Sequence, residues 1–376
     1  MIKLAFIITG LNRGGAEKML LKILSTIDRT TFEPRVFCLT THRSLQSDFI
    51  AAGIQVYTYQ LNKPLSMLSD LWKFLRDCRQ FKPHLIQGWM YHGNLLAWLA
   101  QLFCTAKLIF GIRACLYDFN FESFRTQCFI RLGGYLSSLT DGIIYVSDVA
   151  RAQHEAAGYQ SALNITIANG FELDRFSPNP QWRQEYREKL ALKEQEIAIG
   201  FFARFHKLKG FHNLLEAFAY VHKKQPNTKL VLAGDQVVDQ NSELMATIKH
   251  HHLEDSVILL GELPHPEHCL NALDLFVSPS LQEGFPNVVG EAMACGIPCV
   301  VTDVGDSALA VGDTGLIVPP NDCNALADAL LSAIKEPRTL RQWGEQARLR
   351  IKTEFSLATI VKKYEAAYTT LLEKNG

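Results

Sequence analysis

Apolar and polar positions alternate along the chain in two successive series, each built of short apolar runs and longer amphipathic stretches. The first run, Lys3–Thr9, leads through a glycine-rich turn into a helix from Gly15 whose apolar face comprises Met19, Leu20, Ile23, Leu24 and Ile27. Near-continuous apolar strands alternating with helices are typical of a parallel sheet covered on both faces. We therefore expect an α/β fold.

The strand pattern predicts two doubly wound units. The first series predicts strands at Lys3–Thr9, Arg35–Leu39, Ile54–Tyr57, Leu85–Gln87, Leu108–Ile112 and Gly142–Val146. The pattern breaks at Asn164–Ser177, a predicted interdomain linker, where Asn169-Gly170 marks a turn. It restarts with strands at Glu196–Ala203, Lys229–Ala233, Val257–Gly261, Leu275–Ser278, Cys299–Thr302 and Leu316–Val318. Ligands of such sheets bind beyond the carboxyl ends of the strands, so two facing units would form one cleft.

Length and composition agree with two packed domains. The chain has 376 residues, of which 48% are hydrophobic and 20% charged, which excludes wholesale disorder. Lys and Arg equal Asp and Glu at 38 each, which argues against a general nucleic-acid binder. Residues 1–170 carry 17 basic and 11 acidic side chains, a net charge of +6, so the remainder carries −6. The two halves are expected to have different partners.

Cysteine usage and hydropathy indicate a cytoplasmic protein, at most attached to a membrane surface. The nine cysteines include no C-x-x-C pair, which is the pattern of a reduced, intracellular protein. We expect no metal between Cys295 and Cys299, which are separated by three residues. The N-terminal apolar run is too short for a signal peptide, and Leu95–Phe103 is far short of a membrane span.

The sharpest chemical motif is the stretch Glu283–Glu291, which follows a predicted strand and opens a helix over Val288–Cys295. Backbone N–H groups at a helix start favour an anionic or polyhydroxyl ligand. Carboxylates such as Glu283 and Glu291 accept hydrogen bonds from vicinal hydroxyls, as an acidic residue does from a ribose. A capped helix with surface charges is the alternative interpretation.

Two further strand-to-helix turns carry candidate phosphate contacts. Arg204 and Lys209 flank the turn after the first strand of the second series, where an arginine can bind two phosphate oxygens and a lysine adds a point charge. Such a basic pair can also be solvated surface. Gly14 and Gly15 allow close backbone approach, but their spacing is not G-x-G-x-x-G, so a nicotinamide enzyme is poorly supported.

Taken together, these stretches resemble the retaining nucleotide-sugar glycosyltransferases of the GT-B fold, in particular the group with two glutamates in the same motif. The resemblance extends over nearly the whole chain. It is carried by Gly14-Gly15-Ala16-Glu17, Asn169-Gly170-Phe171, Arg204 with Lys209-Gly210, Glu283 through Val300, and Thr314 through Asp322. It implies an acceptor domain at 1–170, onto which a C-terminal helix within 357–376 packs back, and a donor domain at 171–356.

The resemblance also implies a role for each candidate residue. Arg204 and Lys209 would hold the donor diphosphate as negative charge develops on the leaving nucleotide. Glu291 would bind the ribose, and Glu283 the donor sugar. Backbone groups of Phe285, Asn287 and Val288 would lie near that sugar, Leu263 near the base, and Gly14 and Gly15 near the diphosphate. No cofactor or metal ion is expected, because the two cations would replace the metal.

The acceptor side departs from the family pattern. Ala203 stands where many relatives have glycine, and Arg113 follows the fifth strand where many have histidine. His92 is the nearest substitute, so His92 and Arg113 are the acceptor-side candidates, with His92 also a candidate catalytic group. The alternative for a histidine in this setting is a structural role.

The predicted function is transfer of a sugar from a nucleotide-diphosphate donor, UDP-linked, to a saccharide or lipid-linked acceptor, with retention of the anomeric configuration. The setting would be cell-surface polysaccharide or glycoconjugate synthesis, at the inner face of the plasma membrane. Pro64–Arg79 reads as an amphipathic helix with Leu68, Leu71, Trp72 and Leu75 on one side, able to lie on an anionic bilayer or simply to cover the sheet. A nucleotide-sugar epimerase, a phosphorylase and a noncatalytic nucleotide-sugar-binding protein are the alternatives.

Overall fold

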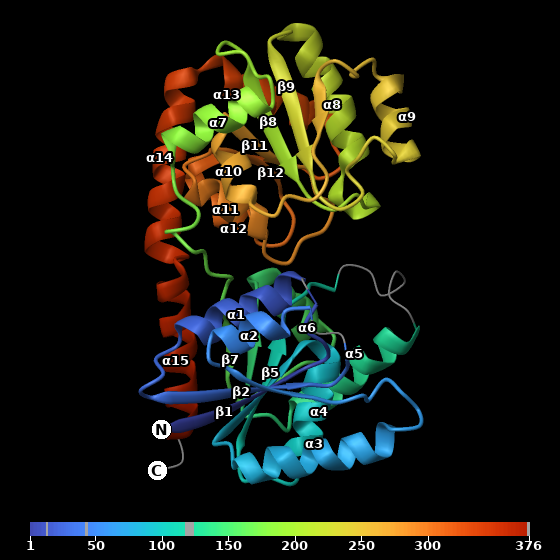
Figure 1. Ribbon diagram of the computed structural model, residues 1–376, viewed down its shortest axis with the longest axis vertical. Helices are drawn as coiled ribbons and strands as arrows, with labels where there is room; N and C mark the ends of the chain where they lie inside the picture. Colours follow the sequence, from blue (N-terminus) through green and yellow to red (C-terminus); the bar gives the residue numbers. More distant parts are fainter. Residues whose placement is uncertain (13, 42–43, 117–123, 374–376) are drawn as a thin grey trace. The chain divides into compact units, whose positions relative to one another are not determined.

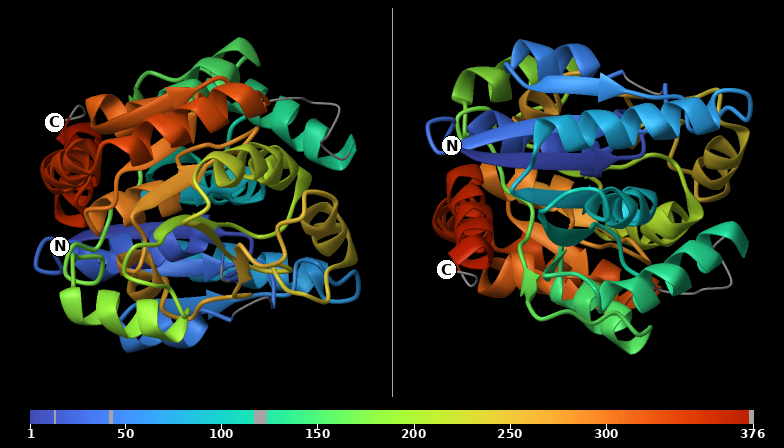
Figure 2. Two further views of the ribbon diagram at one scale, coloured as in Figure 1. Left: turned by 90° about the horizontal axis from the view of Figure 1, so that it is seen from above. Right: turned by 90° about the horizontal axis from the view of Figure 1, so that it is seen from below.

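The computed structural model describes residues 1–12, 14–41, 44–116 and 124–373. The chain divides into two compact units, which are described separately. Unit 1 contains residues 1–170 together with 357–376, and unit 2 contains residues 171–356. The views in Figures 1 and 2 show helices on both faces of each unit's sheet, as the alternating pattern predicts.

Unit 1 is built on a seven-stranded sheet in the order β3-β2-β1-β4-β5-β6-β7. Every pair of neighbouring strands is parallel. The strands are β1 (Ile2–Ile8), β2 (Phe32–Cys38), β3 (Gln55–Thr58), β4 (Leu85–Trp89), β5 (Lys107–Ile112), β6 (Gly142–Tyr145) and β7 (Asn164–Thr166). The helices are α1 (Gly15–Thr26), α2 (Gln46–Ala51), α3 (Met67–Phe81), α4 (Met90–Gln101), α5 (Phe124–Ser137), α6 (Asp148–Ala156) and α15 (Leu357–Glu373).

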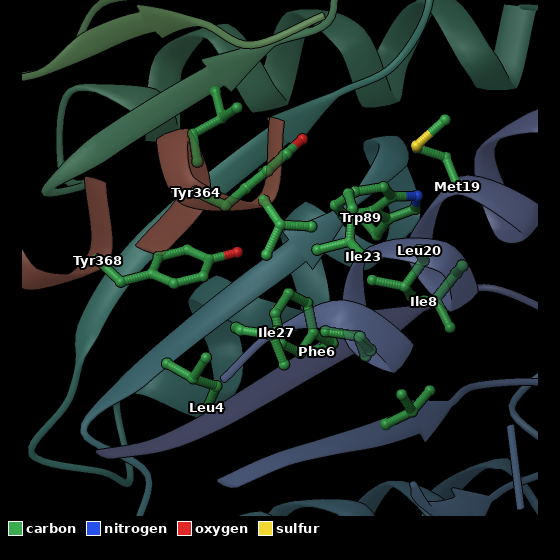
Figure 3. Packing of buried hydrophobic residues seen from close by; sticks show 14 of the residues in the cluster. Leu4, Phe6, Ile8, Met19, Leu20, Ile23, Ile27, Trp89, Tyr364 and Tyr368 are labelled. Atoms are coloured by element: carbon green, nitrogen blue, oxygen red, sulfur yellow. The ribbon is translucent and has the colours of Figure 1, made fainter. Parts of the chain in front are cut away.

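The central strand β1 is buried on both faces, which explains its unbroken apolar sequence. Leu4, Phe6 and Ile8 belong to a core cluster formed with α1 and α15, while Ala5 and Ile7 belong to a second cluster with α3 and α4. Figure 3 shows Tyr364 and Tyr368 of α15 in the first cluster beside the strand residues. The C-terminal helix is therefore part of the unit 1 core.

Unit 2 is built on a six-stranded parallel sheet in the order β10-β9-β8-β11-β12-β13. The strands are β8 (Ile197–Phe202), β9 (Thr228–Ala233), β10 (Val257–Leu259), β11 (Leu275–Ser278), β12 (Cys299–Thr302) and β13 (Gly315–Val318). The helices are α7 (Pro180–Lys189), α8 (Phe211–Lys224), α9 (Ser242–His250), α10 (Pro266–Asn271), α11 (Asn287–Ala294), α12 (Ser307–Val311), α13 (Cys323–Lys335) and α14 (Pro337–Glu354). Short 3₁₀ turns occupy Lys207–Lys209 and Gly312–Thr314.

Two details of the predicted elements are wrong. The predicted linker begins too early, because Asn164–Thr166 forms β7 and pairs with β6 at the edge of the sheet. The predicted apolar side of the helix at Pro64–Arg79 is split in the structure. Leu71 and Leu75 pack against the core, whereas Leu68 and Trp72 are exposed. The buried face of α3 instead carries Phe74, Cys78 and Phe81.

Candidate functional site

A cavity of about 230 Å³ lies in unit 2 at the carboxyl ends of β8 and β11, where a parallel sheet binds its ligands. Its polar lining residues come from the turn after β8 and from the loop before α11. The cavity is lined by Phe201, Phe202, Ala203, Arg204, Lys209, Phe276, Ser278, Glu283, Phe285, Pro286, Asn287, Val288 and Val289. The structure thus brings six of the predicted site residues to one place.

The position of Lys209 is fixed by the turn that carries it. The next residue, Gly210, has φ +72° and packs so closely that an added Cβ would lie 2.1 Å from the carbonyl oxygen of Pro279. The N–H of Leu281 also donates to the carbonyl of Leu208 at 2.8 Å. The turn is therefore joined directly to the segment leading into the Glu283 loop.

Lys209 and Glu283 form an ion pair with each other. The Lys209 Nζ lies 2.5 Å from Glu283 Oε1, and the Ser280 hydroxyl donates to the same oxygen at 2.8 Å. Both charged side chains are largely buried, with 24% and 16% exposed. Such charge-assisted bonds are strong in a partly buried site. The sequence pattern did not indicate this pairing, nor the contact with Ser280.

The segment after β12 packs against the backbone of the Glu283 loop. Gly305 has φ +55°, and an added Cβ would lie 2.3 Å from the Glu283 carbonyl oxygen. The Asp306 N–H donates to the Gly284 carbonyl at 3.1 Å. These contacts hold the backbone of the loop in place at the cavity.

Arg204 and the start of α11 complete the lining. Arg204 is an exposed cation, and its backbone is approached by Gly234, whose added Cβ would lie 2.0 Å from the Ala203 carbonyl oxygen. The helix α11 begins at Asn287, and its N-cap residue, Pro286, makes no side-chain capping bond. An arginine, a lysine and a helix N-terminus therefore converge on the cavity, an arrangement suited to a phosphate group.

Four predicted donor residues do not line this cavity: Glu291 and Leu263 of unit 2, and Gly14 and Gly15 of unit 1. Glu291 lies on α11 four residues beyond Asn287, so helical spacing places it on the same side of the helix. It is close enough to Arg175 to interact electrostatically. Leu263 is partly exposed in the segment after β10.

Gly14 and Gly15 lie where α1 begins, with Gly14 as its N-cap. An added Cβ on Gly14 would lie 2.3 Å from the Glu17 carboxylate, and burial raises the pKa of that carboxyl group. Arg13, which precedes this helix start, lies outside the described residues. The approach of Gly14 and Gly15 to the donor diphosphate stays a prediction.

The two acceptor-side candidates differ in their surroundings. His92 lies in the first turn of α4, with its ring 4.4 Å from that of Phe129, and burial lowers its pKa so that the neutral imidazole prevails at pH 7. Arg113 donates to the Tyr364 hydroxyl at 2.9 Å and to Asn169 Oδ1. These bonds connect the end of β5 with Asn169 and with α15, and the acceptor-side role of Arg113 stays a prediction.

The sequence pattern does not indicate the unusual backbone conformation of Met90, two residues before His92. Met90 has φ +68°, which is uncommon for a residue with a side chain. Gly93 allows α4 to pack closely against β1, because an added Cβ would lie 2.4 Å from the Ile7 carbonyl oxygen. The residues around His92 are thus held firmly against β1. In the sequence, only the adjacent Gly93 could have indicated this close packing.

In the described residues, no three His, Cys, Asp or Glu side chains are grouped so that they could hold a metal ion. No helix within the same residues has the length and apolar character needed to cross a bilayer.

Two family models match the chain. Residues 13–175 match Glycosyltransferase Family 4, and residues 183–350 match Glycosyl transferases group 1. The capsular polysaccharide biosynthesis glycosyltransferase CapM of Staphylococcus aureus is 28% identical, over 84% of this chain and 85% of CapM. The N-acetyl-alpha-D-glucosaminyl L-malate synthase of Bacillus anthracis is 31% identical, but the match spans only 51% of each chain.

Solved structures share the fold. The Anabaena protein Alr3699/HepE, solved in complex with UDP and glucose, superposes with a TM-score of 0.86 at 22% identity, over 98% of this chain and all of that one. The lipopolysaccharide glycosyltransferase WaaG superposes with a TM-score of 0.71 at 18% identity, over 96% of this chain and 98% of WaaG. The chain belongs to the group 1 glycosyltransferases of the GT-B fold, and it is a glycosyltransferase.

Proposed function

We propose that the protein transfers a sugar, with retention of configuration, from a UDP-linked donor to a saccharide or lipid-linked acceptor in cell-surface polysaccharide or glycoconjugate synthesis. The observation that carries the proposal is the convergence of Arg204, Lys209 and the start of α11 on one cavity. The relative CapM is named for capsule synthesis, and HepE was solved with UDP and glucose, which supports this substrate class.

In this proposal the cations stabilise the leaving nucleotide. The donor diphosphate would bind between Arg204, Lys209 and the N–H groups at the start of α11, where developing negative charge is best stabilised. The Lys209–Glu283 pair orients the ammonium before the donor arrives. Since these fixed charges supply the electrostatic stabilisation, the reaction is expected to need neither a metal ion nor a cofactor.

The remaining roles are proposed from the resemblance to the family. Glu283 would accept hydrogen bonds from the donor sugar, and Glu291 from the ribose. Leu263 would lie near the base, while Gly14 and Gly15 would approach the diphosphate. His92 is the proposed acceptor-side group, where burial lowers its pKa and keeps the imidazole neutral, so that it would orient the acceptor without taking its proton. We expect front-face substitution, in which a donor phosphate oxygen assists the acceptor hydroxyl.

A panel of nucleotide sugars tests the function. Purified protein is incubated with UDP-, GDP-, ADP- and dTDP-sugars, with and without candidate acceptors, and release of the nucleoside diphosphate is measured. Acceptor-dependent release of UDP supports the proposal, and NMR of the product reports the anomeric configuration. Matched variants are Arg204→Ala in the cavity and Lys207→Ala in the adjacent turn, outside the cavity lining. Only the first should lose activity.

The alternatives give different products in the same assay. An epimerase converts the donor sugar without any acceptor, and a phosphorylase requires inorganic phosphate. A noncatalytic binding protein shows a shift in melting temperature with the nucleotide sugar but releases no nucleoside diphosphate. Any of these results would contradict the proposed transfer.

We also infer that unit 1 docks on an anionic membrane surface through α3. Leu65 is fully exposed just before this helix, and Leu68 and Trp72 are 75% and 65% exposed along it. The same exposed side of α3 continues with Arg76 and Arg79. Exposed apolar residues next to cations suit the boundary between lipid headgroups and acyl chains. Such docking would place the enzyme on the cytoplasmic face, near a lipid-linked acceptor.

Vesicle flotation tests the docking. The protein should float with phosphatidylglycerol-containing vesicles at low salt and be released by high salt. The variant Leu68→Glu/Trp72→Glu should not float. A control, Leu349→Glu, changes a 60% exposed leucine on α14 and should float like the wild type. Failure of the wild type to bind would refute the docking without affecting the transferase activity.

A further inference from the structure

The chain enters and leaves unit 2 at neighbouring points. Unit 2 begins at Phe171 and ends at Ser356. The Phe171 N–H donates to the Phe355 carbonyl at 2.9 Å, and Phe171 forms a parallel bridge with Ser356. The two segments that connect the units are therefore hydrogen-bonded to each other at the point where they join unit 2.

The rings of Phe171 and Phe355 pack against Phe285, which lines the proposed donor cavity. The ring centroid of Phe285 lies 6.2 Å from that of Phe171 and 5.5 Å from that of Phe355. All three rings are buried, with at most 5% exposed. We call Phe171, Phe285 and Phe355 the crossing cluster. Phe285 also lines the cavity, so one buried side chain contacts both the crossing segments and the proposed donor site.

The crossing cluster also packs against helix α11. Gly290 lies in the middle of α11, and an added Cβ there would lie 2.0 Å from Phe171 Cζ. The ring of Phe171 therefore occupies the place where any larger residue would project. Because α11 begins with Asn287 and Val288 at the cavity, the ring fixes the distance between this helix and the crossing segments.

We infer that Phe171 and Phe355 are positioning residues for the donor site. They act through Phe285 and Gly290 to set the place of the Glu283–Val288 loop and of the first turn of α11. The inference rests on the proposed function for the identity of the ligand, but not for the coupling itself. Displacing catalytic groups by about 1 Å can cost two orders of magnitude in rate, so small shifts of these rings should be measurable at the cavity.

A pair of matched substitutions separates positioning from ordinary core packing. Phe171→Leu alters the crossing cluster, whereas Phe218→Leu alters an equally buried ring on α8 that does not line the cavity. Binding of UDP is measured by calorimetry well below both melting temperatures. We expect about tenfold weaker binding for Phe171→Leu and less than about twofold change for Phe218→Leu. Equal affinities in the two variants would overturn the inference.

A compensating change provides a second test. Gly290→Ala should weaken UDP binding, because the new methyl group meets the Phe171 ring. In the double variant Phe171→Leu/Gly290→Ala, the shorter leucine leaves room for that methyl group. We expect the double variant to bind UDP better than Gly290→Ala alone. If the losses of UDP affinity in the two single variants simply add in the double variant, Phe171 and Gly290 do not interact, which would contradict the inference.

A measurement without ligand keeps this inference separate from the proposed function. Hydrogen exchange of the amides of Phe285 and of residues 287–290 should accelerate in Phe171→Leu but not in Phe218→Leu. If wild-type protein binds no nucleotide, the proposed function fails, yet this exchange still decides whether the crossing cluster holds the loop. Unchanged exchange in Phe171→Leu would refute the coupling.

Discussion

At the scale of single residues, the main finding is that charges predicted to bind the donor already contact one another. Lys209 and Glu283 were expected to bind separate parts of the ligand, but their side chains lie 2.5 Å apart. A largely buried lysine needs a partner for its charge, and Glu283 supplies it. The pair therefore fixes the ammonium group in advance, which lowers the reorganisation needed when negative charge develops.

Lys209→Ala should reduce turnover more than donor affinity. The ammonium is proposed to interact most strongly with the charge that grows on the leaving nucleotide, so kcat should fall by about 10²- to 10³-fold. KM for the donor should change by a smaller factor. Steady-state kinetics with Lys207→Ala as the control measures both. A loss confined to KM would contradict the role in the transition state.

Stability of unit 1 should depend on pH through His154. This histidine is fully buried, its Nε2 lies 3.0 Å from the Tyr91 hydroxyl, and burial lowers its pKa to about 4. Since the unfolded state binds a proton near pH 6.5 and the folded state does not, stability should fall as the pH drops from 6.5 to 4. The loss is on the order of 3 kcal/mol.

Urea unfolding at several pH values checks this expectation. The variant His154→Gln should be less stable than the wild type at pH 7.5 but should lose less stability on acidification. A wild-type curve that stays flat between pH 6.5 and 4.5 would show that His154 is protonated in the folded protein.

At the scale of elements, the predicted strands agree best with the structure where the sequence is continuously apolar. Leu275–Ser278 and Cys299–Thr302 were predicted with their observed bounds, because both are buried on both faces. The edge strand β7 was missed, since Asn164–Thr166 is short and mostly polar. The orientation of α3 was also misjudged, because an apolar residue on a helix can face either the core or solvent.

The turn before α8 can be tested by a glycine substitution. Gly210→Ala places a methyl group against the Pro279 carbonyl and forces a side chain into φ +72°, so unit 2 should lose about 2–4 kcal/mol. Gly296→Ala is the matched control in the same unit. It has φ +75° but its nearest neighbour, Pro178, lies 3.4 Å away. This variant should lose only about 1–2 kcal/mol. Equal losses in urea unfolding would show that the contact with Pro279 is unimportant.

At the scale of the whole molecule, the chain passes from unit 1 into unit 2 and then returns to unit 1. Helix α15 follows unit 2 in sequence but contributes Tyr364 and Tyr368 to the core of unit 1. The Tyr368 hydroxyl donates to Gln87 Oε1 at 2.6 Å, and both residues are fully buried. Unit 1 is therefore completed only when α15 has been synthesised.

Tyr368→Phe tests this dependence. Removing the hydroxyl leaves the buried Gln87 oxygen without that donor, so unit 1 should lose about 1–3 kcal/mol of unfolding free energy. Tyr135→Phe, which changes a 78% exposed tyrosine on α5, should stay within about 0.5 kcal/mol of the wild type. Thermal unfolding of both variants distinguishes a buried hydrogen bond from a general effect of the substitution.

The sequence by itself determined the alternation of apolar strands and helices, because burial of a parallel sheet on both faces requires that pattern. It also determined which polar residues follow the strands, and so which side chains gather at the cavity. Only the tertiary structure decided that Lys209 pairs with Glu283, that Arg113 binds Asn169 and Tyr364, and that Phe171 packs against Gly290. These contacts join residues from 56 to 251 positions apart, and pairing over such separations depends on how the elements pack.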